Sequence, residues 1–541
     1  MPHRWPAALA LTTALAPTVA AQRPAASLPA PNAAAMDAHL KYLADDLLEG
    51  RGPGTRGGML AAKYIAAQFE AMGLEPAGPD GSFFQPVALV GMKPRPAFSW
   101  GAPGASHALT FGDDFVAWAE TPDSAVSVAG AEVLFVGYGI RSPEWQWDDY
   151  KGVDTRGKVL LMLVNDPGLQ DSTIFNGRAL TYYGRWTYKL EQGARMGAAA
   201  VIIIHTTQSA TYPWSVVKGS WSVEQFKLDQ PQSPSLTLAG WVTEDAARAA
   251  LASTGWSLDS LTRAAARRAF RPVRTGLQAD LDVHSQLRHI ESANVVAKIP
   301  GADPVLAKQV VLFSAHWDHK GIGPVVNGDS IYNGAEDNAS GVATMLATAD
   351  ALTRARPRPK RTLLFIATTA EESGLLGSET YAEHPLVPLA QTAAILNTDV
   401  TNVRGRTRDI AALGIERSSL GAVFRRAAAA EGLTATGDPD PSKGAFFRSD
   451  HFPLARAGVP GLSIEAGVDF VGRPAGWGKE QSERYNQERY HQPSDQYSPA
   501  FTYDGMVQQA RVLMRVALAV ADAAALATWL EGSEFQRAKG Q

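Results

Sequence analysis

The sequence contains no cysteine among its 541 residues. Disulfide bridges, cysteine nucleophiles, thiolate metal ligands and lipid attachment through cysteine are therefore excluded. Runs of basic residues are also missing, and the net charge is only −4, so nucleic acid is not expected as a partner. The apolar stretch from Met506 to Leu530 is interrupted by Arg511, Arg515 and Asp522, which predicts a packed helix and no stable membrane span.

The N-terminus has the features of a secretory signal peptide. His3 and Arg4 supply positive charge, and Ala7 to Ala16 form a short apolar segment. We expect residues 1–21 to be the signal peptide and residues 22–36 to be a linker. The mature protein is then expected to be exported. Because it has no disulfides, a bacterial periplasm or the extracellular medium around a bacterium is the expected location.

Apolar runs of strand length alternate with helical patterns in the second half of the chain. The clearest runs are Gln309 to Ala315, Arg361 to Thr369 and Thr392 to Leu396, and Asn338 to Ala351 is helical in pattern. This alternation predicts an α/β fold with a mixed, largely parallel central sheet flanked by helices. Strand patterns also occur at Leu277 to Val283 and at Asn294 to Ile299.

Polar clusters lie at or near the ends of these runs, where the ligand crevice of a parallel sheet is found. A cluster made only of carboxylates would repel itself unless a cation lay among the charges. Histidine together with aspartate and glutamate is a ligand set for zinc or a similar divalent ion. The residues concerned are His316, Asp318, Asp337, Glu371, Glu372 and Asp399.

Taken singly, each of these residues has an ordinary structural explanation. His316 can face solvent, although Asp318 two residues later is well placed to orient it as a metal ligand. Asp337 can simply cap the following helix. Glu371 and Glu372 can end a strand in solvent, but neighbours on an extended backbone point opposite ways, so one can bind metal while the other faces substrate.

Five motifs in order resemble the M28 zinc peptidases, which include bacterial leucyl-type aminopeptidases. They are H-W-D, G-A-E-D-N-A-S-G, E-E-S-G, N-T-D and Y-H-x-P-S-D, the last of which places His491 and Asp495 in a loop. The resemblance covers residues 37–124 and 280–530. Residues 125–279 resemble an inserted, β-rich protease-associated domain, and residues 531–541 are left as a C-terminal tail.

The resemblance implies two Zn²⁺ ions per chain, although Co²⁺ or Mn²⁺ can occupy such sites. His316 and Asp399 would bind one ion, Glu372 and His491 the other, and Asp337 would bridge both. Each ion then has three protein ligands and an open position, which is typical of a catalytic site.

The resemblance also implies roles for the remaining polar residues. Glu371 would be the general base acting on a metal-bridging water, with Asp318 beside it in the catalytic group. Asp318 and Asp495 would orient His316 and His491, respectively. A cis peptide bond after Asp337 is a further expectation.

Residues of the substrate pocket are predicted from the loop Ser442 to His451. Phe446 and Phe447 can form an apolar pocket, and Arg448 can meet a carboxylate, although packing within the loop explains them equally well. Glu336 can receive the free amine of a substrate or can be a solvated neighbour of the site.

The function implied by the resemblance is that of an exported zinc aminopeptidase acting on peptides. A carboxypeptidase, a dipeptidase and a glutaminyl-cyclase-like enzyme on the same scaffold are alternatives, and cyclases work with a single zinc. A non-catalytic receptor-like homologue is the remaining alternative, although such relatives tend to lose ligands and the full set is present here.

Overall fold

The computed structural model describes residues 28–232 and 236–536. The expected signal peptide and the first part of the expected linker lie outside the described residues. Helix α1 (Ala33–Leu43) begins within the segment assigned to the linker, because the Asn32 side chain accepts hydrogen bonds from the backbone N–H groups of Ala34 and Ala35.

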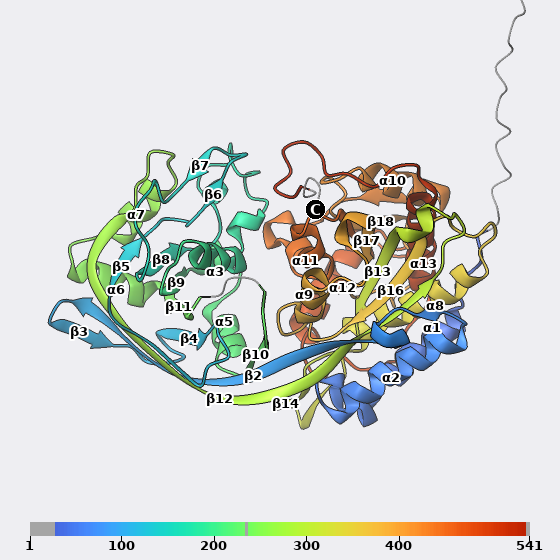
Figure 1. The fold of residues 1–541 in the computed structure, drawn as a ribbon, viewed down its shortest axis with the longest axis horizontal. Coiled ribbons are helices and arrows are strands. Elements are labelled where there is room, and N and C mark those ends of the chain that lie inside the picture. The colour runs from blue at the N-terminus through green and yellow to red at the C-terminus, as the bar shows by residue number, and fades with distance from the viewer. Residues whose placement is uncertain (1–27, 233–235, 537–541) are drawn as a thin grey trace, which may run out of the picture.

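Two long antiparallel strands join two lobes of the molecule (Figure 1). They are β2 (Phe84–Ala102) and β12 (Val273–Ile299), paired from Val295 opposite Phe84 to Gln278 opposite Gly101. The two strand patterns recognised in the sequence are thus the two ends of the single strand β12. Its middle carries few buried side chains, so the sequence pattern there is weak.

The first lobe contains the predicted mixed, largely parallel sheet. Strand order is β19-β18-β20-β17-β13-β16-β12, and the inner strands β20, β17, β13 and β16 are parallel to one another. Strands β12 and β18 pair in antiparallel fashion with β16 and β20. The bounds are β13 Val310–His316, β16 Thr362–Thr368, β17 Thr392–Asn397, β18 Asp409–Leu413, β19 Thr434–Thr436 and β20 Gly461–Ala466.

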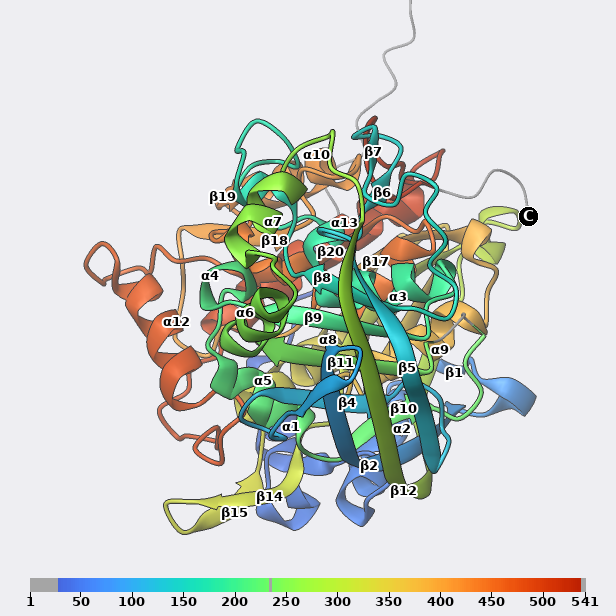
Figure 2. The same ribbon diagram turned by 90° about the vertical axis from the view of Figure 1, so that its left-hand side faces the viewer.

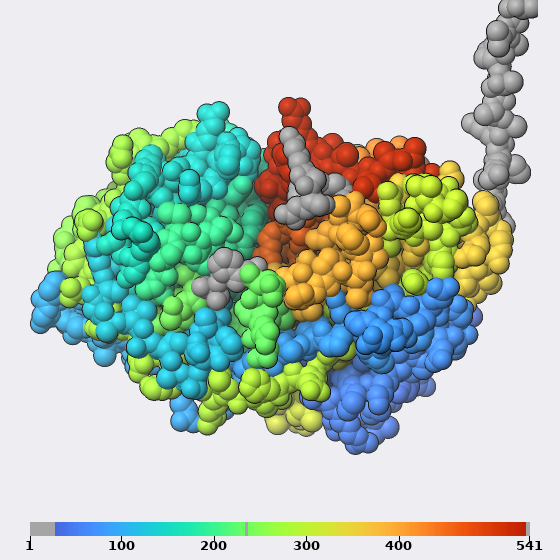
Figure 3. Space-filling view, viewed as in Figure 1, coloured from blue at the N-terminus to red at the C-terminus, as the bar shows by residue number. Residues whose placement is uncertain are grey.

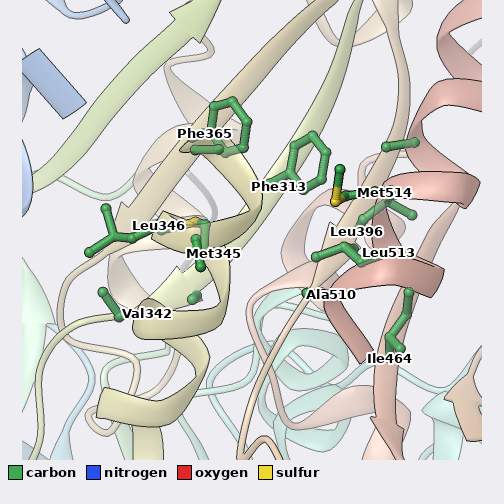
Figure 4. Packing of buried hydrophobic residues seen from close by; sticks show 14 of the residues in the cluster. Phe313, Val342, Met345, Leu346, Phe365, Leu396, Ile464, Ala510, Leu513 and Met514 are labelled. Carbon is green, nitrogen blue, oxygen red and sulfur yellow. The ribbon is translucent and has the colours of Figure 1, made fainter. Parts of the chain in front are cut away.

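Helices cover both faces of this sheet. On one face, Phe313, Phe365 and Leu396 pack against α8 and α13, as Figure 4 shows. Burying each such side chain stabilises the fold by about 1.5–3 kcal/mol. The helices of this lobe are α1, α2 (Arg56–Ala71), α8 (Gly341–Thr353), α9 (Leu376–Glu383), α10 (Leu420–Ala430), α11 (His451–Arg456), α12 (Trp477–Glu488) and α13 (Asp504–Asp522).

Helix α13 confirms the prediction of a packed helix near the C-terminus. The two arginines that interrupt its apolar sequence, Arg511 and Arg515, both pair with Glu431 beyond the end of α10. Within the described part of the chain, no helix combines the length and apolar composition needed to cross a bilayer.

The second lobe continues the sheet in the order β12-β5-β8-β9-β11-β4, and Figure 2 looks onto it. Strand β4 pairs with β11 and forms the edge of the sheet in this lobe. Because β3 and β4 precede residue 125, the lobe starts earlier in the sequence than the expected insertion. Its main elements are β3 (Ala105–Ala108), β4 (Phe115–Ala119), β5 (Ala125–Phe135), β8 (Val159–Leu163), α3 (Trp186–Arg195), β9 (Ala200–His205), α5 (Trp214–Trp221), β10 (Gln225–Leu228), β11 (Leu238–Thr243), α6 (Glu244–Ser253) and α7 (Leu258–Ala265).

Aromatic side chains from both lobes pack together where the lobes meet, a junction visible in Figure 3. Phe446 and Phe447 are buried there with Tyr182 of the second lobe. Phe535, from the segment expected to be a tail, joins the same cluster. The two phenylalanines predicted to line a substrate pocket therefore form part of a core, because aromatic residues from distant segments cover them.

A buried histidine in α11 makes the fold sensitive to acid. His451 lies edge-on to the Phe446 ring, with centroids 4.7 Å apart, and burial lowers its pKa to about 3, with the charge of Arg417 acting in the same direction. The unfolded chain binds this proton near pH 6.5, so stability is full above that pH and falls as the pH drops towards 3.

His451→Phe is therefore expected to reduce the loss of stability between pH 7.5 and pH 4.5 by about 2–3 kcal/mol. Urea unfolding at the two pH values measures this difference. The control is His107→Phe at an exposed position, which should leave the pH dependence unchanged. An acid loss as large in His451→Phe as in the parent protein would contradict this account.

Candidate active site

Side chains from five separate segments converge at the carboxyl ends of the parallel strands. His316 is the last residue of β13, Glu371 and Glu372 follow β16, and Asp399 follows β17. Asp337 lies in the turn before α8, where its peptide bond to Asn338 is cis, as predicted. His491 comes from the loop after α12 and has a left-handed backbone with φ of 56°.

Asp337 stands between the two histidines. Its Oδ1 lies 3.2 Å from His316 Nε2, and its Oδ2 lies 3.3 Å from His491 Nε2. Asp399 Oδ1 is 3.3 Å from His316 Nε2, and Glu372 Oε2 is 3.0 Å from His491 Nε2. The structure therefore brings together the five predicted metal ligands in two groups that share Asp337.

The chemistry of these atoms fits divalent cations. The Nδ1–H of His316 donates to the backbone carbonyl of Asp318 at 3.1 Å, which leaves a lone pair on Nε2 in the neutral ring. That lone pair faces oxygens of Asp337 and Asp399, so a cation between them would satisfy all three atoms. Asp318 Oδ2 is also buried without a hydrogen-bond partner. Nitrogen and oxygen donors of this kind suit zinc.

Glu371 has the properties of a proton acceptor. Its Oε2 lies 4.0 Å from His316 Nε2, and its side chain is 11% exposed, so it borders the cluster without being sealed off. Burial raises its pKa well above the usual value; His316 opposes this, and the charges of Asp399 and Glu372 add to it. A raised proton affinity suits a general base working near neutral pH.

Asp318 and Asp495 both accept hydrogen bonds from backbone N–H groups near the cluster. The Asp318 carboxylate accepts the backbone N–H of Glu371 at 3.2 Å, while its backbone carbonyl orients His316. Asp495 accepts the N–H groups of Glu336 and Asp337, each at 3.1 Å, and so fixes the turn that carries Asp337. Both acids thus position neighbouring backbone, a role that sequence spacing does not reveal.

Glu336 does not face the cluster as a free acid. It is fully buried and pairs with Arg404 at 2.6 Å and with Arg489 at 2.9 Å. The expectation that it receives a substrate amine is therefore corrected, because two arginines from distant segments already neutralise it.

Arg51, in the glycine-rich loop, is a supporting residue that the sequence did not reveal. It is buried, and it donates to the carbonyls of Trp317 at 2.8 Å and Gly334 at 2.9 Å. These hydrogen bonds tie together the segments that carry His316 and Asp337.

His319 and Lys320 also contact the cluster and were missed. His319 Nδ1 lies 2.6 Å from Glu372 Oε1, yet both His319 nitrogens are buried without a hydrogen bond. Lys320 Nζ lies 2.9 Å from Glu372 Oε2. His319, Asp337 and Glu372 form a further group able to bind an ion, so His319 is an additional candidate ligand. The second histidine of the H-W-D-H sequence was the available signal.

Ser449 and Glu465 form the wall of the site on the β20 side. Ser449 Oγ donates to Asp399 Oδ2 at 2.9 Å. Glu465, near the end of β20, accepts from Ser463 at 2.7 Å, and burial raises its pKa to about 8, with the charges of Asp399 and Asp438 adding to the effect. Among the described residues, no cation pairs with Glu465. It is an acid without a counter-ion near the cluster.

The arrangement defines a class: an α/β protein with a candidate cation site next to a carboxylate of raised proton affinity. Residues 294–517 match the model of peptidase family M28. The match lies within the region in which the sequence motifs resemble this family, and it confirms the predicted resemblance.

Similar proteins include a vacuolar membrane protease from Lachancea thermotolerans, 36% identical over 123 residues. That match covers 23% of this chain and 11% of the relative, so the chain spans only about a tenth of it. Leupeptin-inactivating enzyme 1 of Streptomyces exfoliatus is 29% identical over 179 residues, 33% of this chain and 36% of that protein.

Solved structures of similar shape include an aminopeptidase from Aneurinibacillus sp. strain AM-1, with a TM-score of 0.48 and 18% identity, covering 94% of this chain and 98% of that one. A zinc aminopeptidase from Bacillus subtilis has a TM-score of 0.42 and 19% identity, covering 94% and 99%. At TM-scores below 0.5, these likenesses establish nothing further.

Proposed function

We propose that the protein is an exported di-zinc aminopeptidase that removes N-terminal residues from peptides. The observation that carries the proposal is the position of Asp337, which turns one oxygen towards each of two histidines.

Different residues would hold the ions and transfer the proton. His316, Asp337 and Asp399 would hold one ion, and Asp337, Glu372 and His491 the other, with His319 beside the second. Ions held there would supply Lewis-acid chemistry, which would lower the pKa of a water and stabilise negative charge on the carbonyl oxygen of the cleaved bond. Glu371 takes a proton from the attacking water and delivers it to the nitrogen of the leaving amine.

Glu465 is proposed to receive the free α-ammonium group of the substrate, in place of Glu336. Loss of one charge-assisted hydrogen bond of this kind corresponds to roughly a 10- to 100-fold rise in KM. Glu465→Gln should show that rise with aminoacyl-p-nitroanilides. Glu416→Gln, which removes an exposed acid paired with Arg425, is the matched control. An unchanged KM in Glu465→Gln would remove this residue from substrate binding.

A panel of aminoacyl-amides and N-acetylated peptides, assayed with and without a chelator, tests the function itself. The proposal predicts cleavage only of substrates with a free amine, and loss of activity with the chelator. Cleavage of N-acetylated peptides would favour a carboxypeptidase. Cyclisation of N-terminal glutamine with release of ammonia would favour a cyclase.

A further inference from the structure

A small hollow at the junction of the two lobes is lined by two arginines and no acid. Arg185, at the start of α3, comes from the second lobe, and Arg448 comes from the loop before α11 in the first. Leu180 and Tyr212 are also part of the wall, and the space of about 10 Å³ has room for one water-sized group, such as a single oxygen of a carboxylate. The hollow can therefore hold one oxygen of a larger polar ligand.

The charge of the hollow is uncompensated. Arg185 Nε is buried without a hydrogen-bond partner. Burial lowers the pKa of Arg185 to about 9, and the neighbouring charge of Arg448 acts in the same direction. Across residues 28–232 and 236–536, neither guanidinium is paired with a carboxylate. Two cations facing one space without a counter-ion favour an anionic ligand.

Arg448 links the hollow to the candidate active site through its neighbour in the sequence. Arg448 directly precedes Ser449, whose hydroxyl donates to the predicted ligand Asp399 at 2.9 Å. Arg448 is therefore one residue away in the sequence from a side chain that contacts a predicted ion ligand.

We propose that Arg185 and Arg448 form a carboxylate-binding subsite to which both lobes contribute. Guanidinium groups bind carboxylates through paired, charge-assisted hydrogen bonds. The subsite takes the C-terminal carboxylate of a short peptide or an acidic side chain close to the cleaved bond. The inference rests on the proposed peptidase function, and it gives the second lobe a part in selecting substrates.

Binding to the ion-loaded Glu371→Gln variant tests the subsite separately from turnover. Calorimetry would compare Leu-Gly with Leu-Gly-amide, and Leu-Asp-amide with Leu-Asn-amide. We expect the ligand with the additional carboxylate to bind roughly 10- to 100-fold more tightly in at least one pair. A difference in the first pair identifies the C-terminal carboxylate as the ligand, and a difference in the second identifies the side chain.

Introducing Arg448→Leu or Arg185→Leu into this variant should abolish the preference and leave binding of the uncharged ligands unchanged. Arg448 is exposed, so its replacement is compatible with folding even if that of the partly buried Arg185 is not. Arg178→Leu, an exposed position outside the hollow, is the matched control and should keep the preference.

Equal binding within both pairs, or a preference that survives Arg448→Leu, would overturn the subsite. Turnover of Leu-Gly-amide by the wild-type protein would in that case leave the aminopeptidase proposal standing. The reverse pattern, in which the carboxylate preference is present but no free-amine substrate is cleaved, would overturn the proposed function and retain the subsite.

Discussion

Glu371→Gln is expected to lower kcat by roughly 10²–10⁴-fold while the protein keeps its ions. The amide cannot accept the proton of the attacking water, but it has nearly the same size as the carboxyl group. Because Glu371 is assigned no ion, zinc content measured by atomic absorption should match that of the wild type. Kinetics with an aminoacyl-p-nitroanilide and metal analysis of the same preparation give both values.

A second glutamate of the same lobe provides a matched control for the Glu371→Gln replacement. Glu383 is another glutamate of this lobe, at the end of α9 and outside the ion cluster, so Glu383→Gln should retain near-normal kcat. If Glu371→Gln kept most of its kcat, the proton acceptor would have to be another group. If it lost zinc as well, Glu371 would instead belong to the ligand set.

Asp337→Asn is expected to weaken binding of both ions and to abolish activity. The carboxylate directs one oxygen towards each histidine, and the neutral amide offers only one oxygen and less charge. We expect zinc affinity to fall by more than about 100-fold, because the loss of a residue that only hydrogen-bonds to a metal ligand already lowers metal affinity by about 10–100-fold. Calorimetric titration of the metal-free protein with zinc measures the number of sites and their affinities.

Replacements of the neighbouring ligands serve as controls because each is assigned to one ion only: Asp399 contacts His316, and Glu372 contacts His491 and His319. Asp399→Asn should weaken the ion next to His316, and Glu372→Gln the ion next to His491. Each single replacement is thus expected to leave one tight site. Two intact sites in Asp337→Asn would contradict the shared position of this residue.

The sequence predicted the sheet because short apolar runs are local patterns, and the resemblance to the M28 peptidases implied the candidate ion ligands. The strands ending at His316 and preceding Glu371 and Asp399 are short apolar runs, and parallel strands carry their terminal residues to one edge. His316, Glu372 and Asp399 thus lie at or just after strand ends, whereas Asp337 and His491 come from a turn and a loop.

The supporting residues could not be predicted in the same way, because their roles depend on partners far away in the chain. Glu336 is next to Asp337 in sequence, but Arg404 and Arg489 turn it into a buried ion pair. Phe446 and Phe447 are covered by rings that include Phe535, 88 or more positions later in the sequence. Glu465 lies in no motif at all, and only the sheet order places it next to the strand that leads to Asp399.

Zinc-edge anomalous diffraction from crystals of the zinc-loaded protein tests the central claim most directly. The account predicts two peaks per chain, about 3.5–4 Å apart, with an oxygen of Asp337 bound to each. One peak should lie beside His316 and Asp399, and the other beside Glu372 and His491. A single peak, or two peaks of which Asp337 binds only one or neither, would contradict it.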